Sequence, residues 1–541
     1  MSHDDLHPDA VLSAPVGSAR WSRRGLLGAA AGVVGVSPLL VACRSSGSEG
    51  APSSGTAVEV APTTLRRTEP VRSRNGVLAT TLRPAPAMFD IGAERPISTW
   101  LYDGVLPGRT WEIEPGDVLR IELVNDLPPA PPHDGPVEMD RPHQWTTTNL
   151  HTHGLHVSPK GAGDDVFVAV EPGGSHRYEI EVPADHPGGL FWYHPHRHGG
   201  VAQQIRGGMA GAIIIRGELD KVPEVAAAVE HLLVVQAIEL DDNFAVAAPI
   251  PDPSSSEAFF PRSQILYPIN GGLAPTIAMR PGEVQRWRIV NAAEGKSMNF
   301  VVDGVELHVL AWDGLTLAEP ELVPNLYLSP GNRVDVLVRA VTPGTHLLEL
   351  TPGSSQRPSS QGVPSTSTAS TLPPELVTRP VATVVVEGDA VEMVLPVSLP
   401  AWDPPMLPIA ERRTVVYSVE RDGDTFKTFG VDGQPFLPGE TVRRVRLGTG
   451  EEWTIVNGLD DKYPQHAHSF HIHVNPFQVI AVNGVTLDRP LWRDTFPLAG
   501  SNGDSFTFRT NFVDFTGRFV HHCHIVSHED LGMMEIVEVY P

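Results

Sequence analysis

A repeated segment constrains the fold of this chain more than any other feature. PGDVLRIELVN ends at Asn125, PGEVQRWRIVN ends at Asn291 and GEEWTIVN ends at Asn457, so the three asparagines are spaced by 166 residues. Each copy has a turn upstream, at Asp103-Gly104, Asn270-Gly271-Gly272 and Asp432-Gly433. Self-similarity at a fixed period indicates repeated structural units. We therefore expect three units of similar fold.

The units are predicted to be all-β. From about residue 67, short apolar runs alternate with Pro, Gly, Asn and Asp, and no long segment has a helical period. The 52 prolines and 50 glycines suit strands and turns better than helices. We expect each unit to be a Greek-key β-sandwich.

The segment FVHHCHIVSHEDLGMM, Phe519–Met534, is rich in metal-binding residue types. A cysteine, two imidazoles and a weak methionine sulfur are the ligand set of a blue-copper electron-transfer site. Cys523, His528 and an axial Met533 would supply three of these ligands, so one histidine must come from elsewhere.

The two histidines beside the cysteine predict a second centre. If this segment is extended, His522 and His524 point to one face and Cys523 to the other. An electron that arrives at Cys523 would then reach the second centre through a single residue.

Three more histidine clusters could build that second centre: His151-Thr152-His153, His194-Pro195-His196, and His468-Ser469-Phe470-His471-Ile472-His473. Alternate residues of a strand are roughly 6–7 Å apart, which suits imidazoles that reach neighbouring metals. The first and third units carry all the clusters, so we expect the centre where these two units meet. The second unit is interpreted as a spacer, and its Pro330–Asp335 segment as structural.

In this order, the four clusters resemble the four copper-binding segments of the multicopper oxidases, the laccase-like family. The resemblance covers about residues 67–541. It implies three cupredoxin-like domains, which we place at residues 67–218, 219–392 and 393–541, the second without copper ligands.

The resemblance also implies a role for each position and four coppers per chain. His468, Cys523 and His528 would bind the type 1 copper, with Met533 axial. His151 and His471 would bind the type 2 copper. The type 3 pair would be bound by the remaining histidines of the clusters, His153, His194, His196, His473, His522 and His524.

Two acids match carboxylates that relay protons in the family. They are Glu529, directly after His528, and Asp164, although the neighbouring Asp165 leaves that assignment open by one residue. The alternative for both is a carboxylate that orients a ligand histidine.

The activity implied is one-electron oxidation of a reducing substrate coupled to four-electron reduction of O2 to water. Phenols and aromatic amines are the expected substrates, with outer-sphere electron transfer to His468. With ten methionines and no methionine-rich insertion, oxidation of metal ions is less favoured. A methionine axial ligand tunes the copper potential, and the resemblance suggests a lower value than with leucine or phenylalanine.

Other functions explain the clusters less completely. A periplasmic copper-binding or copper-resistance protein acting on Cu(I) is the main alternative. A copper nitrite reductase needs three histidines at its catalytic copper and leaves most clusters unused. A structural zinc site takes four ligands, and a relative that has lost its metals would not keep the full ligand set.

The first 66 residues predict export. Arg23-Arg24 followed by an apolar run resembles a twin-arginine signal peptide over residues 1–42. It ends in Leu40-Val41-Ala42-Cys43, which resembles a lipobox. Cys43 would then be lipidated and would anchor the protein to the outer face of the membrane, in the periplasm or at the cell surface. Residues 43–66 are expected to form a flexible tether.

The charge and cysteine content limit the partners. With 40 basic against 64 acidic residues, the net charge is −24, which disfavours nucleic-acid binding. Cys43 and Cys523 are the two cysteines, and we predict no disulfide between them. We expect a monomer whose membrane contact is the lipid at Cys43.

Overall fold

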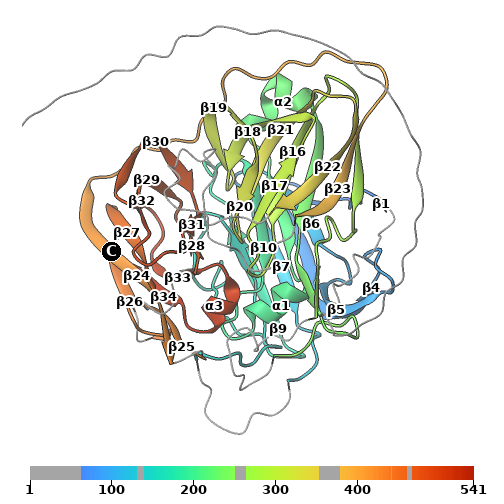
Figure 1. Cartoon of the computed structure of the whole chain (residues 1–541). Helices are drawn as coiled ribbons and strands as arrows, with labels where there is room; N and C mark the ends of the chain where they lie inside the picture. Colours follow the sequence, from blue (N-terminus) through green and yellow to red (C-terminus); the bar gives the residue numbers. More distant parts are fainter. Residues whose placement is uncertain are drawn as a thin grey trace, which may run out of the picture. The chain divides into compact units, whose positions relative to one another are not determined.

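In this computed structural model, the structure describes residues 63–130, 139–249, 263–351, 378–422, 425–439, 442–459 and 466–541 (Figure 1). All of these belong to one compact unit, Glu59–Pro541. The predicted leader, Cys43 and residues 43–62 of the predicted tether lie outside the described residues. Among the residues that are described, no helix is long and apolar enough to cross a membrane.

The first unit has two main sheets. One sheet orders β2 (Val71–Arg72), β6 (Gly108–Ile113), β11 (Gly211–Ile215), β10 (Gly189–His194) and β8 (His151–His153). The other orders β3 (Val77–Leu82), β7 (Val118–Val124) and β9 (Ser175–Glu181). A hairpin of β4 (Pro84–Phe89) and β5 (Ile97–Tyr102) and helix α1 (Val201–Gly207) complete the unit.

The second unit also has two main sheets. One orders β12 (Val229–Val235), β16 (Val284–Asn291), β21 (Arg333–Ala340), β18 (Val305–Trp312) and β19 (Leu315–Val323). The other orders β1 (Thr63–Thr64), β15 (Pro275–Met279), β23 (Arg379–Val386), β22 (Gly344–Thr351), β17 (Met298–Val302) and β20 (Leu326–Leu328). Three shorter pieces are the pair β13 (Ile238–Leu240) and β14 (Gln264–Leu266), the 3-10 helix η1 (Glu218–Lys221) and helix α2 (Pro223–Ala227).

Strand β1 changes one expected boundary. Thr63 and Thr64 fall within the predicted tether, yet they pair in parallel with Pro275 and Thr276 of β15. The chain therefore joins the second unit's sheet before it builds the first unit.

The third unit carries the C-terminal clusters. One sheet orders β25 (Thr425–Val431), β24 (Ile409–Asp422), β27 (Thr449–Leu459), β32 (Ser505–Phe512), β29 (Phe477–Val482) and β30 (Val485–Arg493). The other orders β26 (Val442–Arg446), β34 (Met534–Tyr540), β33 (Gly517–Cys523), β28 (His468–Ile472) and β31 (Thr495–Leu498). Helix α3 (Val526–Asp530) lies between β33 and β34 in the chain.

The repeated segment occupies the same place in every unit. It forms β7, β16 and β27, each parallel to one neighbour (β3, β12, β24) and antiparallel to the other (β9, β21, β32). Each final asparagine is fully buried, and its amide donates to two loop carbonyls. The sequence repeat is therefore a structural repeat, and the prediction of three all-β units is confirmed.

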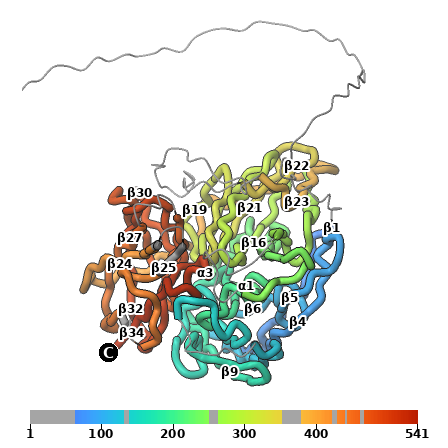
Figure 2. Tube along the Cα trace, turned by 60° about the horizontal axis from the view of Figure 1, so that its bottom comes forward, coloured from blue at the N-terminus to red at the C-terminus, as the bar shows by residue number. Residues whose placement is uncertain are grey.

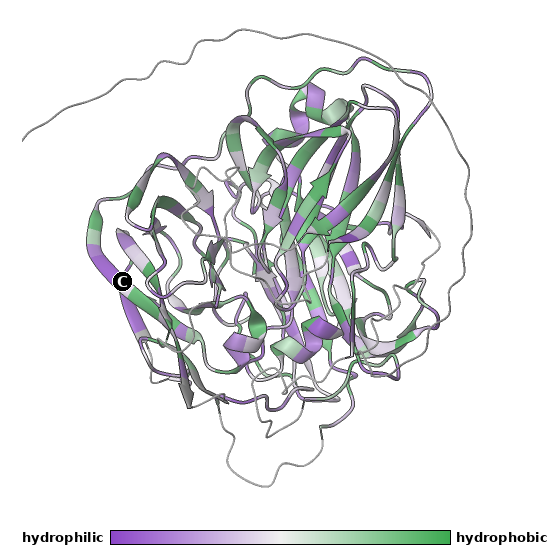
Figure 3. Cartoon of the chain, in the orientation of Figure 1, coloured by the Kyte–Doolittle hydropathy of each residue, from purple (hydrophilic) through white to green (hydrophobic). Residues whose placement is uncertain are grey.

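Each unit buries its own apolar core. The third unit's core takes Trp453 and Phe506 from one sheet and Phe470 and Val537 from the other, as expected for a sandwich. Separate clusters fill the second and first units, and Figure 3 shows apolar residues concentrated along the strands. Helices α1 and α3 lie side by side (Figure 2), where Val201 and Ala202 donate backbone hydrogen bonds to the Asp530 carboxylate.

Candidate metal centres

Two pairs of neighbouring strands hold most of the predicted ligands. In the first unit β8 pairs with β10, which places His151 opposite His194. In the third unit β28 pairs with β33, which places His471 opposite His522. All twelve predicted ligands are buried. Strand pairing therefore gathers residues that are far apart in the sequence.

Cys523 lies at the centre of the first candidate site. Its Sγ is 3.5 Å from His468 Nδ1 and 3.5 Å from His528 Nδ1. Met533 is buried in the same core, and its carbonyl accepts the Cys523 backbone N–H at 3.1 Å. His468 therefore lies where a further histidine is needed beside Cys523, and its role as a copper ligand stays a prediction. The axial role of Met533 stays a prediction.

Two trios of histidines lie behind this site. One contains His153, His194 and His524, and the other contains His196, His473 and His522. In the first trio His153 Nδ1 is 3.2 Å from His524 Nε2 and 3.4 Å from His194 Nε2. In the second, His196 Nε2 is 3.1 Å from Nε2 of both His473 and His522.

The trios divide the six predicted type 3 ligands into two sets of three. Each trio takes histidines from both the first and the third unit, and each contains one of the two residues that flank Cys523. The prediction that Cys523 and its neighbours face different centres agrees with this geometry.

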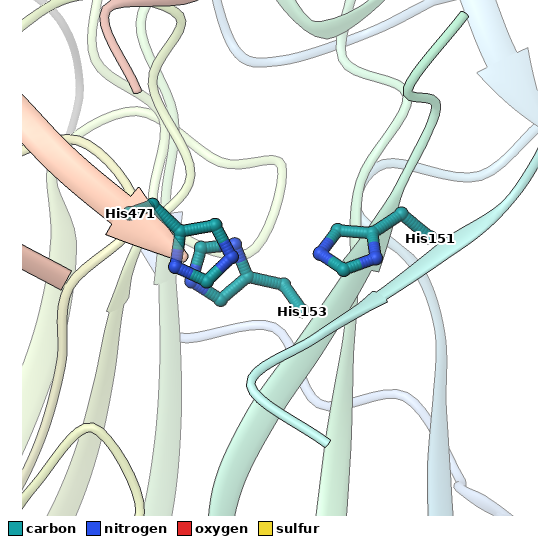
Figure 4. A group of neighbouring side chains, drawn as sticks. All are labelled: His151, His153 and His471. Atoms are coloured by element: carbon teal, nitrogen blue, oxygen red, sulfur yellow. The ribbon is translucent and has the colours of Figure 1, made fainter. Parts of the chain in front are cut away.

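His151 and His471 approach a third position beside the trios. His471 stacks on His153 with 3.8 Å between ring centroids, and His151 lies next to them (Figure 4). The Nδ1 atoms of His151 and His471 bond to Asp164 Oδ2 and to the Asp494 carbonyl, both at 2.8 Å. Their Nε2 atoms are buried and have no hydrogen-bond partner among the described residues. A metal ion would supply the missing partner.

The protonation of these side chains also suits a metal. Burial lowers the pKa of every trio histidine, to about 4 for His196 and His522, so the imidazoles are neutral near pH 7. Neutral imidazole is the form that binds metals. Burial raises the pKa of Cys523 to about 12, and coordination is what deprotonates such a thiol. The donor set of thiolate and imidazoles fits copper.

The two predicted acids both touch ligand histidines. Glu529 is fully buried, with its oxygens 3.1 Å from His522 Nδ1 and 3.4 Å from His196 Nδ1. Burial raises the pKa of Glu529 to about 7, although His196 opposes the change. Asp164 bonds His151, and burial raises its pKa to about 7 as well. Since burial also keeps His151 neutral, this contact is a hydrogen bond rather than an ion pair.

Asp165 plays a different part from its neighbour. Its Oδ1 accepts the Phe167 backbone N–H at 3.0 Å within the turn. The geometry therefore favours Asp164 over Asp165 as the acid that serves the centre.

Sequence reasoning missed several residues of the site. His466 Nε2 is 3.0 Å from His528 Nε2, on the side of that ring away from Cys523. A signal existed, because His466 and His468 repeat the spacing of the other clusters. Asp494 and Thr495 contact the histidines, and Arg333, from the Pro330–Asp335 segment interpreted as structural, binds Asp494.

Four histidines in or near the clusters fall outside the ligand pattern, and each has a protein partner. His156 bonds the Val474 carbonyl and Asp514, and His186 bonds the Pro187 carbonyl. His198 bonds the Met139 carbonyl, and His521 lies between Tyr417 and Glu535.

Comparison with protein families and relatives gives a consistent result. Three family models described as multicopper oxidase match residues 143–220, 237–370 and 408–541. A laccase of Bacillus stratosphericus is 25% identical over 486 residues, covering 82% of this chain and 91% of the relative. A multicopper oxidase of Staphylococcus aureus is 22% identical over 481 residues, covering 87% and 90%.

Solved structures share the fold. A multicopper oxidase from Campylobacter jejuni, described as a metallo-oxidase, superposes with a TM-score of 0.70 at 23% identity, covering 89% of this chain and 96% of that one. A multicopper oxidase from Aquifex aeolicus superposes with a TM-score of 0.70 at 17% identity, covering 89% and 100%.

Proposed function

This chain belongs to the multicopper oxidase family, and from that premise we propose that it couples one-electron oxidation of phenols or aromatic amines to the reduction of O2 to water. It is a laccase-like enzyme with cupredoxin-like domains and copper as its cofactor. The observation that carries the proposal is the position of Cys523, between the His468–His528 pair and two histidine trios.

The residues that would hold copper are those that the family resemblance implies, and the gathered histidines and Cys523 support this assignment. His468, Cys523 and His528 would hold the type 1 copper, with Met533 axial, and His151 and His471 the type 2 copper. The two trios would hold the type 3 pair. Bound copper would supply one-electron oxidation of the donor at the type 1 site and O2 reduction at the type 2 and type 3 positions.

The protein's own part is to connect, orient and exclude water. The backbone joins Cys523 directly to His522 and His524, so the route between the two sites is covalent. Burial of all twelve ligands excludes water from both sites. Glu529 lies against His196 of the first unit and His522 of the third, and is placed to hold a proton beside the site of O2 reduction.

Both histidines of the proposed type 1 site are buried. The resemblance implies electron transfer to His468, which is 2% exposed; His528 is 7% exposed, and His466 lies against its outer nitrogen. We propose that electrons reach the type 1 copper through the His466–His528 pair.

Oxygen uptake by the copper-loaded protein tests this function. With a phenolic donor, we expect O2 consumption without accumulation of hydrogen peroxide. Cu(I) and Mn(II) serve as alternative donors, because oxidation of metal ions, including copper resistance through Cu(I), is the rival function. Uptake with Cu(I) and none with any phenol would favour the rival. Copper binding without O2 uptake in the presence of any donor would indicate that the protein sequesters copper instead.

We further propose that the mature protein is exported, carries a lipid at Cys43 and is a monomer. The support is the sequence alone, namely Arg23-Arg24, the apolar run and the lipobox-like Leu40–Cys43. Metabolic labelling with a radioactive fatty acid should mark the wild type but not Cys43→Ser. Equal labelling of both would refute the anchor.

A further inference from the structure

A turn of the second unit reaches the histidines of the other two. Gly331, in the Pro330–Arg333 turn, has φ +89°, and a Cβ there would lie 3.0 Å from the His524 ring and 3.1 Å from the His153 ring. The two rings therefore pack directly against the backbone of the second unit. A unit that only separated its neighbours would need no such contact.

Arg333 ends this turn and begins β21, and it is fully buried. Its guanidinium donates to both Asp494 oxygens, at 2.7 Å (Oδ1) and 2.5 Å (Oδ2). It also donates to the carbonyls of Leu190, Gly331 and Asp313. All five of its N–H groups are thus used, and they join the second unit to the first through Leu190 and to the third through Asp494.

Asp494 and the next residue contact the ligand histidines. Thr495 Oγ1 donates its hydrogen to Asp494 Oδ1 at 2.8 Å, so it can accept but not donate in its 3.1 Å contact with His153 Nε2. His153 Nε2 must therefore carry the hydrogen, which leaves Nδ1 free to bind a metal. The Asp494 carbonyl accepts from His471 Nδ1 at 2.8 Å, which leaves His471 Nε2 free.

These contacts set which nitrogen each imidazole presents. His153 Nδ1 is the atom that faces His194 and His524, and His471 Nε2 is buried and has no hydrogen-bond partner in the described part of the chain. Partners of this kind orient metal ligands and fix their tautomers.

We propose that Arg333 is a positioning residue for the histidine centre, acting through Asp494 and Thr495 on His153 and His471. The inference rests on the proposed copper centre of the trios. It assigns the second unit a part in building that centre, although this unit supplies no ligand.

The same unit offers a matched control. Arg286 is also buried, at 3% exposure, and makes a two-bond ion pair with Asp335, at 2.9 and 2.6 Å. It donates to Asp220 as well, at 2.7 Å. The pair with Asp335 joins β16 to β21 within the second unit's own sheet. It thus has the same chemistry, but no contact with a predicted ligand is described for it.

The experiment compares Arg333→Met, Arg333→Lys and Arg286→Met with the wild type after loading with copper. The readouts are copper atoms per chain, the visible band of type 1 copper and the paramagnetic resonance signal of type 2 copper. Arg333→Met and Arg333→Lys should keep the type 1 band. They should bind the type 2 copper and the type 3 pair, together the trinuclear copper, about 10- to 100-fold more weakly. Arg286→Met should load like the wild type.

Two results would overturn the proposal. One is wild-type copper content and type 2 signal in both Arg333 variants. The other is equal loss of trinuclear copper in Arg286→Met, which would show a general effect of a broken buried ion pair. If Arg333→Met does not fold, Arg333→Lys decides, because it keeps the charge but lacks the planar fork. A wild type that binds no trinuclear copper would instead refute the proposed function.

Discussion

At the scale of single residues, the site depends on groups that hold histidines rather than on the histidines alone. Asp164 and Asp165 are neighbours with different partners, His151 for the first and the Phe167 N–H for the second. Asp164→Asn should weaken copper binding at the type 2 position about 10- to 100-fold, because the carboxylate orients His151. Asp165→Asn should leave copper binding at this position unchanged. A copper titration followed by the type 2 resonance signal compares the two variants, and equal effects would contradict this division of roles.

His466 gives a second prediction at this scale. If copper binds His528 Nδ1, then His528 Nε2 carries a hydrogen and donates it to His466 Nε2, 3.0 Å away. Loss of an acceptor makes a ligand imidazole less basic, so His466→Leu should raise the potential of the type 1 copper. A redox titration of the visible band measures the shift. His346, which bonds the Thr342 carbonyl on the second unit, offers His346→Leu as the control. An unchanged potential in His466→Leu would show that the contact has no electronic effect.

At the scale of elements, the repeated asparagines tie the end of a strand to the neighbouring loops, one of which leads to His468. Asn457 ends the repeated segment, and its amide donates to the carbonyls of His466 and Ala499 at 2.8 and 2.7 Å. The first of these bonds fixes the chain two residues before His468.

Asn457→Ala should therefore destabilise the third unit and loosen the type 1 site. Both bonds are partly buried, and the loss of an ordinary intramolecular hydrogen bond costs about 0.5–1.5 kcal/mol. Chemical denaturation of the metal-free protein measures the free energy of unfolding, and the visible band after copper loading reports the site. The exposed Asn243 provides Asn243→Ala as a control that should match the wild type. Wild-type stability in Asn457→Ala would mean that the repeat is not a structural anchor.

The sequence predicted elements and ligands wherever the pattern was local. Alternation along a strand placed His522 and His524 opposite Cys523, and the repeat located β7, β16 and β27. The contact between Arg333 and Asp494 across units could not be predicted, because 161 positions separate them in the chain and the Pro330–Asp335 segment indicates only a structural turn. The same holds for β1, whose two residues show no strand signal before they pair with β15.

At the scale of the whole molecule, partly buried charges join the first unit to the second. Glu230 of β12 accepts from Arg216, just after β11, at 2.9 Å and from Arg288 of β16 at 3.0 Å. Burial alone would raise the pKa of Glu230, but Arg288 and Arg216 outweigh it and lower the pKa from 4.5 to about 2. The folded state thus favours the charged form. This contribution to stability is complete above about pH 4.5 and is lost as the pH falls toward about 2.

The thermal midpoint of the metal-free protein should fall over this window, and Glu230→Gln should reduce the slope. Glu224, in the first turn of α2, makes Glu224→Gln the control. Identical slopes in the wild type and Glu230→Gln would show that Glu230 does not couple the units' stability to pH.

The central claim is that Cys523 links a type 1 copper to a trinuclear centre that reduces O2. The most direct measurement is copper content, visible spectrum and O2 uptake of the wild type beside Cys523→Ser, each loaded with copper and given a phenolic donor. We expect four coppers, an intense blue band and uptake in the wild type. In Cys523→Ser we expect three coppers, no blue band and no uptake. Sustained uptake by Cys523→Ser, or a blue wild type that consumes no O2, would contradict this claim.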